Sequence, residues 1–232
     1  MAVITLSRQF GSSGTDIAAH ICEKLNYRYL DKLLMNQVAT EIGMFDLELA
    51  EIPESHYKMR HFVDRLLFPG PHSFAQFAVK PRDMHEPEAR RVLQLDEARC
   101  ANLVRSAILA AYRADNAVIV GRGGQAVLHD KSDVFHVRVQ APLEDRVRRV
   151  QQQQAIDHDE ARDLIRRYDE ISAHYLSSLF GIDWDDSALY HVTINTARTS
   201  VVAAVDLILA AVAHLPARTG EDAPVLSEAE QR

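Results

Sequence analysis

Apolar residues follow two patterns along this chain, and the two patterns together predict its secondary structure. Short runs of apolar, partly β-branched residues are typical of buried strands. Such runs occur at residues 2–6, 27–30, 117–121, 134–139 and 191–195. The second pattern repeats every three or four residues, which places apolar side chains along one face of a helix. Helices with this pattern are predicted to begin near Thr15, Asp31, Asp96, Pro142, Asp157 and Val201.

The alternation of these strands and helices predicts the fold class. Strands that alternate with long helices form a parallel sheet with helices on both faces, an α/β architecture. Ligands of such sheets bind beyond the carboxyl ends of the strands. We therefore expect the loops after residues 3–6, 117–121 and 191–195 to converge on a site. Residues 42–95 contain helical fragments broken by proline and glycine, so we expect an irregular insertion there.

Length, charge and cysteine content narrow the class of protein. A chain of 232 residues suits one domain with a full core, which we assign to residues 1–215. Residues 216–232 lack apolar periodicity and are expected to be a disordered tail. The net charge of −7 argues against nucleic acid as a partner. With two cysteines and no run of eighteen apolar residues, we expect a cytoplasmic protein without a membrane segment.

The stretch SRQFGSSGTD, residues 7–16, lies between the first strand and the first helix. Its glycines allow several backbone N–H groups to turn inward, and the helix adds the positive end of its dipole, so the stretch can bind phosphate. The full signature G-x-x-x-x-G-K-[ST] contains a lysine, whose place here is taken by Gly14, or by Thr15 if the register shifts by one residue. A tight turn without a ligand fits these residues equally well.

Arginines supply the other candidate phosphate contacts. Arg122 follows the strand run 117–121 in the sequence GRGG, where its guanidinium could bind a phosphate in a bidentate manner or simply be solvated in a turn. Two successive predicted helices carry Arg146, Arg148, Arg149, Arg162, Arg166 and Arg167. These arginines could close on transferring phosphates, or they could form solvated helix faces paired with nearby aspartates.

The loop INTARTS, residues 194–200, follows the last predicted strand. Asn195 and Thr196 could contact a nucleobase or cap the closing helix, and Arg198 could lie over the base. The eleven histidines show no metal-ligand spacing.

Three stretches occur together in an order that resembles one protein family. They are VITLSRQFGSSGTDIAAHICEKLNYRYLD, AVIVGRGGQAVL and LSSLFGIDWDDSALYHVTINTARTS. They resemble the cytidylate kinase-like proteins, a branch of the P-loop nucleoside monophosphate kinases. The resemblance implies a three-layer α/β/α P-loop kinase fold, with a helical monophosphate-binding insertion over about residues 31–95 and an arginine-bearing lid over about residues 145–175. It also implies transfer of the γ-phosphoryl group of ATP, with Mg²⁺, to a nucleoside monophosphate such as CMP.

The resemblance assigns roles to individual residues. Asp31 matches an acidic residue that opens the monophosphate-binding region, and Arg122 matches the arginine of a GRD stretch, where it would contact the acceptor. The candidate catalytic residues are Arg8, Arg122, Arg149, Arg162 and Arg166. The candidate phosphate-binding residues are Gly11, Ser12, Ser13, Gly14, Thr15 and Asp16, of which Thr15 would also bind Mg²⁺. Asn195 and Arg198 are the candidate base contacts.

Three departures from the family pattern leave two hypotheses open. The phosphate-loop lysine is absent, the aspartate of the GRD stretch is Gly123, and no acidic residue ends the strand run 117–121. Arg8 is the candidate replacement for the lysine. The chain is accordingly expected to be an ATP-dependent kinase of a small-molecule acceptor or a non-catalytic nucleotide-binding regulatory protein. The long apolar helix faces would also allow a homodimer.

Overall fold

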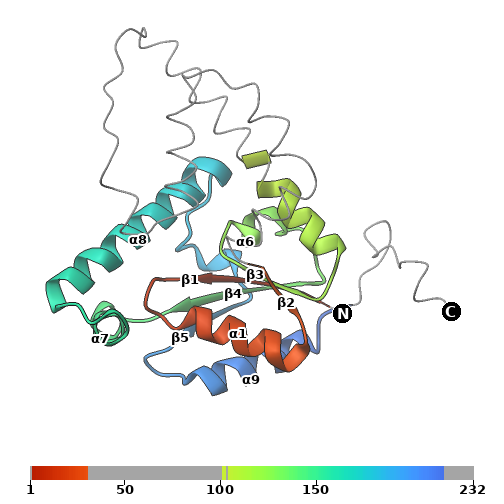
Figure 1. Cartoon of the computed structure of the whole chain (residues 1–232). Coiled ribbons are helices and arrows are strands. Elements are labelled where there is room, and N and C mark those ends of the chain that lie inside the picture. The colour runs from red at the N-terminus through yellow and green to blue at the C-terminus, as the bar shows by residue number, and fades with distance from the viewer. Residues whose placement is uncertain (1, 31–100, 103, 217–232) are drawn as a thin grey trace, which may run out of the picture.

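A five-stranded parallel sheet forms the centre of the protein (Figure 1). The computed structural model describes residues 2–30, 101–102 and 104–216. The strand order is β2-β3-β1-β4-β5, so β1 lies in the middle of the sheet. The strands are β1 (Val3–Arg8), β2 (Arg28–Leu30), β3 (Ala117–Val120), β4 (Val134–Gln140) and β5 (Val192–Asn195). Each strand run predicted from the sequence is confirmed.

Helices cover both faces of the sheet, which gives the three layers of an α/β/α fold (Figure 1). Helices α1 (Gly14–Leu25) and α9 (Val201–Val212) pack on one face. Helical residues 104–113 and the short helix α6 (Gly124–Val127) pack on the other. Side chains of β1 are divided between the two cores, because successive residues of a strand point to opposite faces: Ile4 joins the first core and Val3 the second. The predicted fold class is confirmed.

Helices α7 (Leu143–Gln154) and α8 (His158–Phe180) form a hairpin beside the carboxyl end of the sheet (Figure 1). Ala155 adopts the left-handed conformation that ends α7, and the Asp157 carboxylate accepts a hydrogen bond from the Glu160 N–H at the start of α8. A small apolar core, to which Val147 and Ile165 contribute, holds the two helices together. Both helices of the predicted lid region are therefore confirmed, whereas their movement as a lid stays a prediction.

The closing helix α9 is capped differently from the expectation. Its N-cap is Ser200, whose hydroxyl accepts a hydrogen bond from the Ala203 N–H at 3.2 Å. The Asn195 side chain instead accepts the Ala197 N–H at 3.0 Å and tightens the preceding turn. The interpretation of Asn195 and Thr196 as helix caps is therefore wrong, because the turn places α9 several residues further along the chain.

Two expected features fall wholly or partly outside the described residues. The insertion over residues 31–95, including Asp31, and the tail from residue 217 are not described. Within the described part of the chain, no helix combines the length and the hydropathy needed to cross a membrane. Cys22 is half-buried against the core, and burial raises the pKa of its thiol to about 11.

A buried histidine in β4 should make the stability of the fold depend on pH. Burial and, to a smaller extent, the neighbouring His191 lower the pKa of His136 from 6.5 to about 4. The unfolded chain therefore takes up a proton before the native state does as the pH falls from about 6.5 to 4. We expect this histidine to remove about 3 kcal/mol of stability over that range. Urea unfolding at a series of pH values measures the loss.

Variants separate the His136 contribution from that of acidic groups. His136→Gln cannot titrate, so its free energy of unfolding should fall less steeply between pH 6.5 and pH 4.5 than that of the wild type. His214→Gln, at an exposed site beyond α9, should retain the wild-type slope. Equal slopes for His136→Gln and the wild type would contradict the assignment.

Candidate phosphate-binding site

The glycine-rich loop joins the carboxyl end of β1 to α1, at the centre of the sheet. Gly11 has a φ of +76°, and a Cβ atom at this position would lie 2.9 Å from the Val150 side chain of α7. Glycine is therefore required both by the backbone conformation and by the close approach of α7. A hydrogen bond inside the turn stabilises it: the Ser12 hydroxyl donates to the Gln9 carbonyl at 2.7 Å.

The N-terminus of α1 is open toward a cavity. Its N-cap residue, Ser13, has a left-handed backbone and its side chain makes no capping hydrogen bond. Among the described residues, no acceptor meets the backbone N–H groups of Ser13, Gly14, Thr15 and Asp16. Unpaired N–H groups and the helix dipole together favour an anion at this position.

A cavity of about 510 Å³ lies directly over these N–H groups. The loop forms one wall, the turn after β3 forms a second, and α8 forms a third. The predicted phosphate-binding residues that line it are Gly11, Ser12, Ser13, Gly14, Thr15 and Asp16. The expected convergence of the loops after β1 and β3 is therefore present, whereas residues 196–200 after β5 are not among those that line the cavity.

Arg8 lies in this cavity between the loop and the turn after β3. Its Cβ atom is 2.5 Å from the position that a Cβ of Gly14 would occupy, so its stem packs against the start of α1. Its Nη1 atom is 2.7 Å from the corresponding position at Gly121. The arginine side chain thus spans from one predicted phosphate-contacting segment to the other.

Arg122 also lines the cavity, in a turn that α8 holds in place. The backbone of Arg122 has a φ of +62°, a left-handed conformation that is uncommon for residues other than glycine, asparagine and aspartate. Its carbonyl accepts a hydrogen bond from the Tyr175 hydroxyl at 3.3 Å, and its guanidinium carbon lies 5.8 Å from the centre of the same ring. Phe180 packs against Gly123 so closely that a Cβ there would lie 2.4 Å from the ring. Helix α8 therefore fixes the position of Arg122.

The cavity wall formed by α8 is aromatic and hydroxyl-bearing. Tyr168, Ile171, Ser172 and Tyr175 recur at helical spacing and face the cavity. The ring of Tyr168 stacks on Phe10 of the loop, with centroids 4.3 Å apart. This wall was not predicted from the sequence, although the spacing of the four residues could have indicated a common helix face.

The predicted lid arginines lie elsewhere among the described residues. Arg162 and Arg166 are not among the residues that line the cavity, and Arg166 is exposed. The Arg162 guanidinium is 3.9 Å from the Glu144 carboxylate of α7. Arg149 is not among the lining residues either, and its Nη1 atom donates to the Gly11 carbonyl at 3.3 Å. Direct contact of these three arginines with phosphate stays a prediction.

Arg146, by contrast, is buried in a contact that joins the loop to both lid helices. Its guanidinium donates to the Phe10 carbonyl at 3.2 Å and to the Asp169 carboxylate at 2.6 Å. The same carboxylate accepts the Phe10 N–H at 3.3 Å. The arginine on α7 and the aspartate on α8 thus both hold the backbone of Phe10.

A second buried arginine was not predicted. Arg138 of β4 is 2% exposed and donates hydrogen bonds to the Trp184 carbonyl and the Asp185 carboxylate. Its guanidinium carbon lies 4.6 Å from the centre of the Trp184 ring, which lines the cavity. The Tyr190 hydroxyl accepts a hydrogen bond from Arg138 at 3.4 Å and donates one to the Trp184 carbonyl at 2.9 Å. It also lies 3.3 Å from the hydroxyl oxygen of the cavity-lining Ser7. This network lies beneath the cavity floor.

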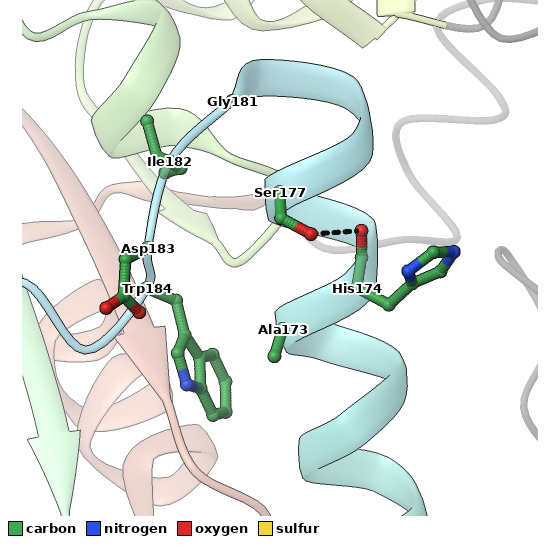
Figure 2. Close-up of a pocket in the computed structure, with 7 residues that line it drawn as sticks. All are labelled: Ala173, His174, Ser177, Gly181, Ile182, Asp183 and Trp184. Carbon is green, nitrogen blue, oxygen red and sulfur yellow. Dashed lines mark hydrogen bonds between the residues drawn. The ribbon is translucent and has the colours of Figure 1, made fainter.

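Trp184 also lines a smaller pocket of about 420 Å³ on another side of α8. Figure 2 shows that its walls are the α8 residues Ala173, His174 and Ser177 and the segment 181–184 that follows the helix. Ser177 donates to the His174 carbonyl at 3.1 Å. No residue of the phosphate loop reaches this pocket, so we place the candidate site in the larger cavity.

The base and metal contacts predicted from the sequence are untested by the geometry. Asn195 and Arg198 are not among the residues that line the cavity, and Arg198 is exposed. Thr15 and Asp16 line it, and both are exposed. The described residues contain no cluster of three or more histidine, cysteine or acidic side chains that could hold a metal ion. Base contact and metal binding at these residues stay predictions.

The parallel sheet and the glycine-rich turn between its central strand and α1 define a P-loop kinase fold. The sequence profile of the cytidylate kinase-like family matches residues 3–198, and the chain belongs to this family. It is 26% identical over 215 residues to the cytidylate kinase of Methanocaldococcus jannaschii, covering 92% of this chain and 98% of that protein. It is 23% identical over 214 residues to the cytidylate kinase of Thermococcus kodakarensis, covering 92% and 89%.

A solved structure supports the fold independently. A crystal structure of an uncharacterized protein from Eubacterium ventriosum superimposes with a TM-score of 0.62. The match covers 92% of this chain and 99% of that one, at 19% sequence identity. At this sequence identity the similarity shows only that the two proteins share a fold, the sheet and helices described above.

Proposed function

We propose that the protein transfers the γ-phosphoryl group of ATP to a small-molecule acceptor, with a nucleoside monophosphate such as CMP as the leading candidate. The observation that carries the proposal is the open N-terminus of α1, where unpaired N–H groups and Arg8 face one cavity. Family membership supports the reaction type, and the cytidylate kinases among its relatives support the choice of CMP.

Phosphoryl transfer requires mainly positioning and positive charge around the transferred group. The N–H groups of the loop would bind the phosphates of ATP, and Arg8 would supply the charge that a loop lysine normally provides. Arg122, which α8 holds on the opposite side, would bind the acceptor phosphate. The aromatic wall of α8 would exclude water from the reacting groups.

The cavity offers one side-chain oxygen that fits a magnesium ion, the hydroxyl of Thr15. Mg²⁺ prefers oxygen ligands, and the Thr15 hydroxyl stands at the edge of the cavity beside the phosphate-binding N–H groups. Thr15 would therefore hold the ion. The ion, when bound, supplies further positive charge to the phosphates of ATP.

The reaction can be tested with a panel of acceptors. With ATP and Mg²⁺ present, we expect a coupled assay for ADP formation to show transfer to at least one nucleoside monophosphate, with CMP measured first. The control omits the acceptor and measures background hydrolysis. If neither monophosphates nor other small hydroxyl-bearing acceptors are phosphorylated, the kinase proposal fails.

The second candidate is a non-catalytic nucleotide-binding regulator. It is favoured by the absence of a lysine from the loop and by the lack of an acidic residue at the end of β3. In this case ATP raises the melting temperature of the protein although no acceptor is phosphorylated. If millimolar ATP leaves the melting temperature unchanged, this candidate fails as well.

A further inference from the structure

Two side chains hold the glycine-rich loop from outside the cavity. The Thr196 hydroxyl, just after β5, donates a hydrogen bond to the Ser12 carbonyl at 2.9 Å. Arg149 of α7 binds Thr196 twice, through its hydroxyl at 2.9 Å and its carbonyl at 2.8 Å. Neither Thr196 nor Arg149 is among the residues that line the cavity, and Thr196 is 9% exposed.

The contact with Thr196 determines where one phosphate-binding group points. A peptide unit is planar and trans, so the N–H of Ser13 points away from the side to which the Ser12 carbonyl points. The carbonyl is hydrogen-bonded to Thr196, which does not line the cavity, whereas Ser13 lines it and its N–H has no acceptor among the described residues. Holding the carbonyl therefore aims this N–H into the cavity.

Arg149 fixes the direction of the Thr196 hydroxyl proton. A guanidinium is a donor only, so the hydroxyl oxygen must accept from Arg149 and its single proton remains for another partner. The Ser12 carbonyl at 2.9 Å is closer than the Gln140 carbonyl at 3.4 Å. These hydrogen bonds thus run in one direction, from Arg149 through Thr196 to the loop, beside the direct bond from Arg149 to the Gly11 carbonyl at 3.3 Å.

Arg146 orients a second peptide unit of the loop, Phe10–Gly11, in the same way. Its guanidinium holds the Phe10 carbonyl at 3.2 Å, which turns the Gly11 N–H to the other side of the loop. Ser13 also has a φ of +60°, a conformation that a serine rarely adopts unless its surroundings hold it. External contacts, rather than local preference, therefore maintain the shape of this loop.

We propose that Thr196 and Arg149 are positioning residues that preorganise the loop for the phosphates of the nucleotide, acting through the Ser12–Ser13 peptide rather than by touching the ligand. This inference rests on the proposed function, because it takes the bound anion to be a polyphosphate. It also gives Arg149 a role different from contact with the transferred group.

Calorimetry with three variants tests the proposal. Thr196→Val keeps the shape of the side chain but loses the hydroxyl, Thr196→Ser keeps the hydroxyl, and Thr193→Val makes the same replacement at an exposed site on β5. We expect Thr196→Val to raise the dissociation constant of ATP about tenfold, as loss of one hydrogen bond would. Thr196→Ser should remain within about threefold of the wild type, and Thr193→Val should equal it.

Inorganic tripolyphosphate, which has no base, separates loop positioning from base contact. If Thr196 acts on the loop, Thr196→Val weakens tripolyphosphate and ATP by the same factor. If the variant weakens ATP but not tripolyphosphate, Thr196 contacts the base and the proposal is wrong. Equal binding by Thr196→Val and the wild type also overturns it. A wild type that binds neither probe overturns both the proposed function and this inference.

Arg149→Met tests the same proposal with a variant in which Thr196 is unchanged. A positioning role predicts a raised KM for ATP, a kcat within about threefold of the wild type, and less than additive effects when the change is combined with Thr196→Val. A fall in kcat at unchanged ATP affinity would instead show that Arg149 touches the transferred group, and would overturn the proposal. Thermal unfolding of each variant confirms that the fold is intact before binding is compared.

Discussion

Replacing Arg8 by methionine is expected to lower the rate of phosphoryl transfer about a hundredfold while the protein remains folded. The change removes a positive charge from the cavity but keeps an unbranched stem against Gly14. Loss of one electrostatic donor at the reacting group costs about 3 kcal/mol of transition-state stabilisation when nothing compensates. Steady-state kinetics at saturating ATP, together with the dissociation constant of ATP, measure the effect.

Two further variants show whether the charge of Arg8 is responsible. Arg148→Met removes a charge from an exposed arginine on α7, where it pairs with Asp145, and should leave the rate unchanged. Arg8→Lys keeps the charge but not the planar guanidinium, and should lie between the wild type and Arg8→Met. If Arg8→Met turns over and binds ATP as the wild type does, Arg8 has no part in the site.

The strands could be predicted because a buried parallel strand has a nearly continuous apolar sequence. The run at β3, AVIV, is buried at every position, and its pattern in the sequence is unambiguous. The glycine-rich turn could also be found, because glycines between a strand and a helix are a local signal. The absence of the signature lysine was visible in the sequence, although the physical reason for it was not.

The orientation of the arginines could not be predicted from the sequence. Arg146, Arg149 and Arg162 all occur on amphipathic helices, and their surroundings in the sequence are similar. What separates them is tertiary packing, since α7 approaches the loop at Gly11 and brings Arg146 and Arg149 onto its carbonyls. Arg162 lies further along the hairpin and meets Glu144 instead.

Polar residues of β4 were missed for a related reason. His136 and Arg138 alternate with valines, a pattern that normally marks a solvent-facing side of a strand. Both are buried, because the segment that carries Trp184, Tyr190 and His191 covers this side of the strand. Only the path of a distant segment reveals that Arg138 supports the cavity floor.

Introducing the missing lysine by Gly14→Lys is expected to damage the site rather than to improve it. Gly14 occupies the lysine position of the signature, but a Cβ there would lie 2.5 Å from the Cβ of Arg8. The contact is with the root of the arginine side chain, so rotation of the guanidinium cannot relieve it, and the backbone must shift. We expect a loss of about 2 kcal/mol in the free energy of unfolding and weaker binding of ATP.

The position of the new Cβ, rather than the new charge, should cause this damage. Gly14→Ala should therefore reproduce most of the loss, whereas Ala19→Lys, which adds the same charge at an exposed site on α1, should leave stability and ATP binding unchanged. Urea unfolding and calorimetry of the three variants measure both quantities. Tighter ATP binding by Gly14→Lys at undiminished stability would show that the loop can accept a lysine. If the variants behave as expected, an arginine on the preceding strand and a lysine in the loop exclude one another, and the space that Arg8 occupies explains why this chain has glycine at position 14.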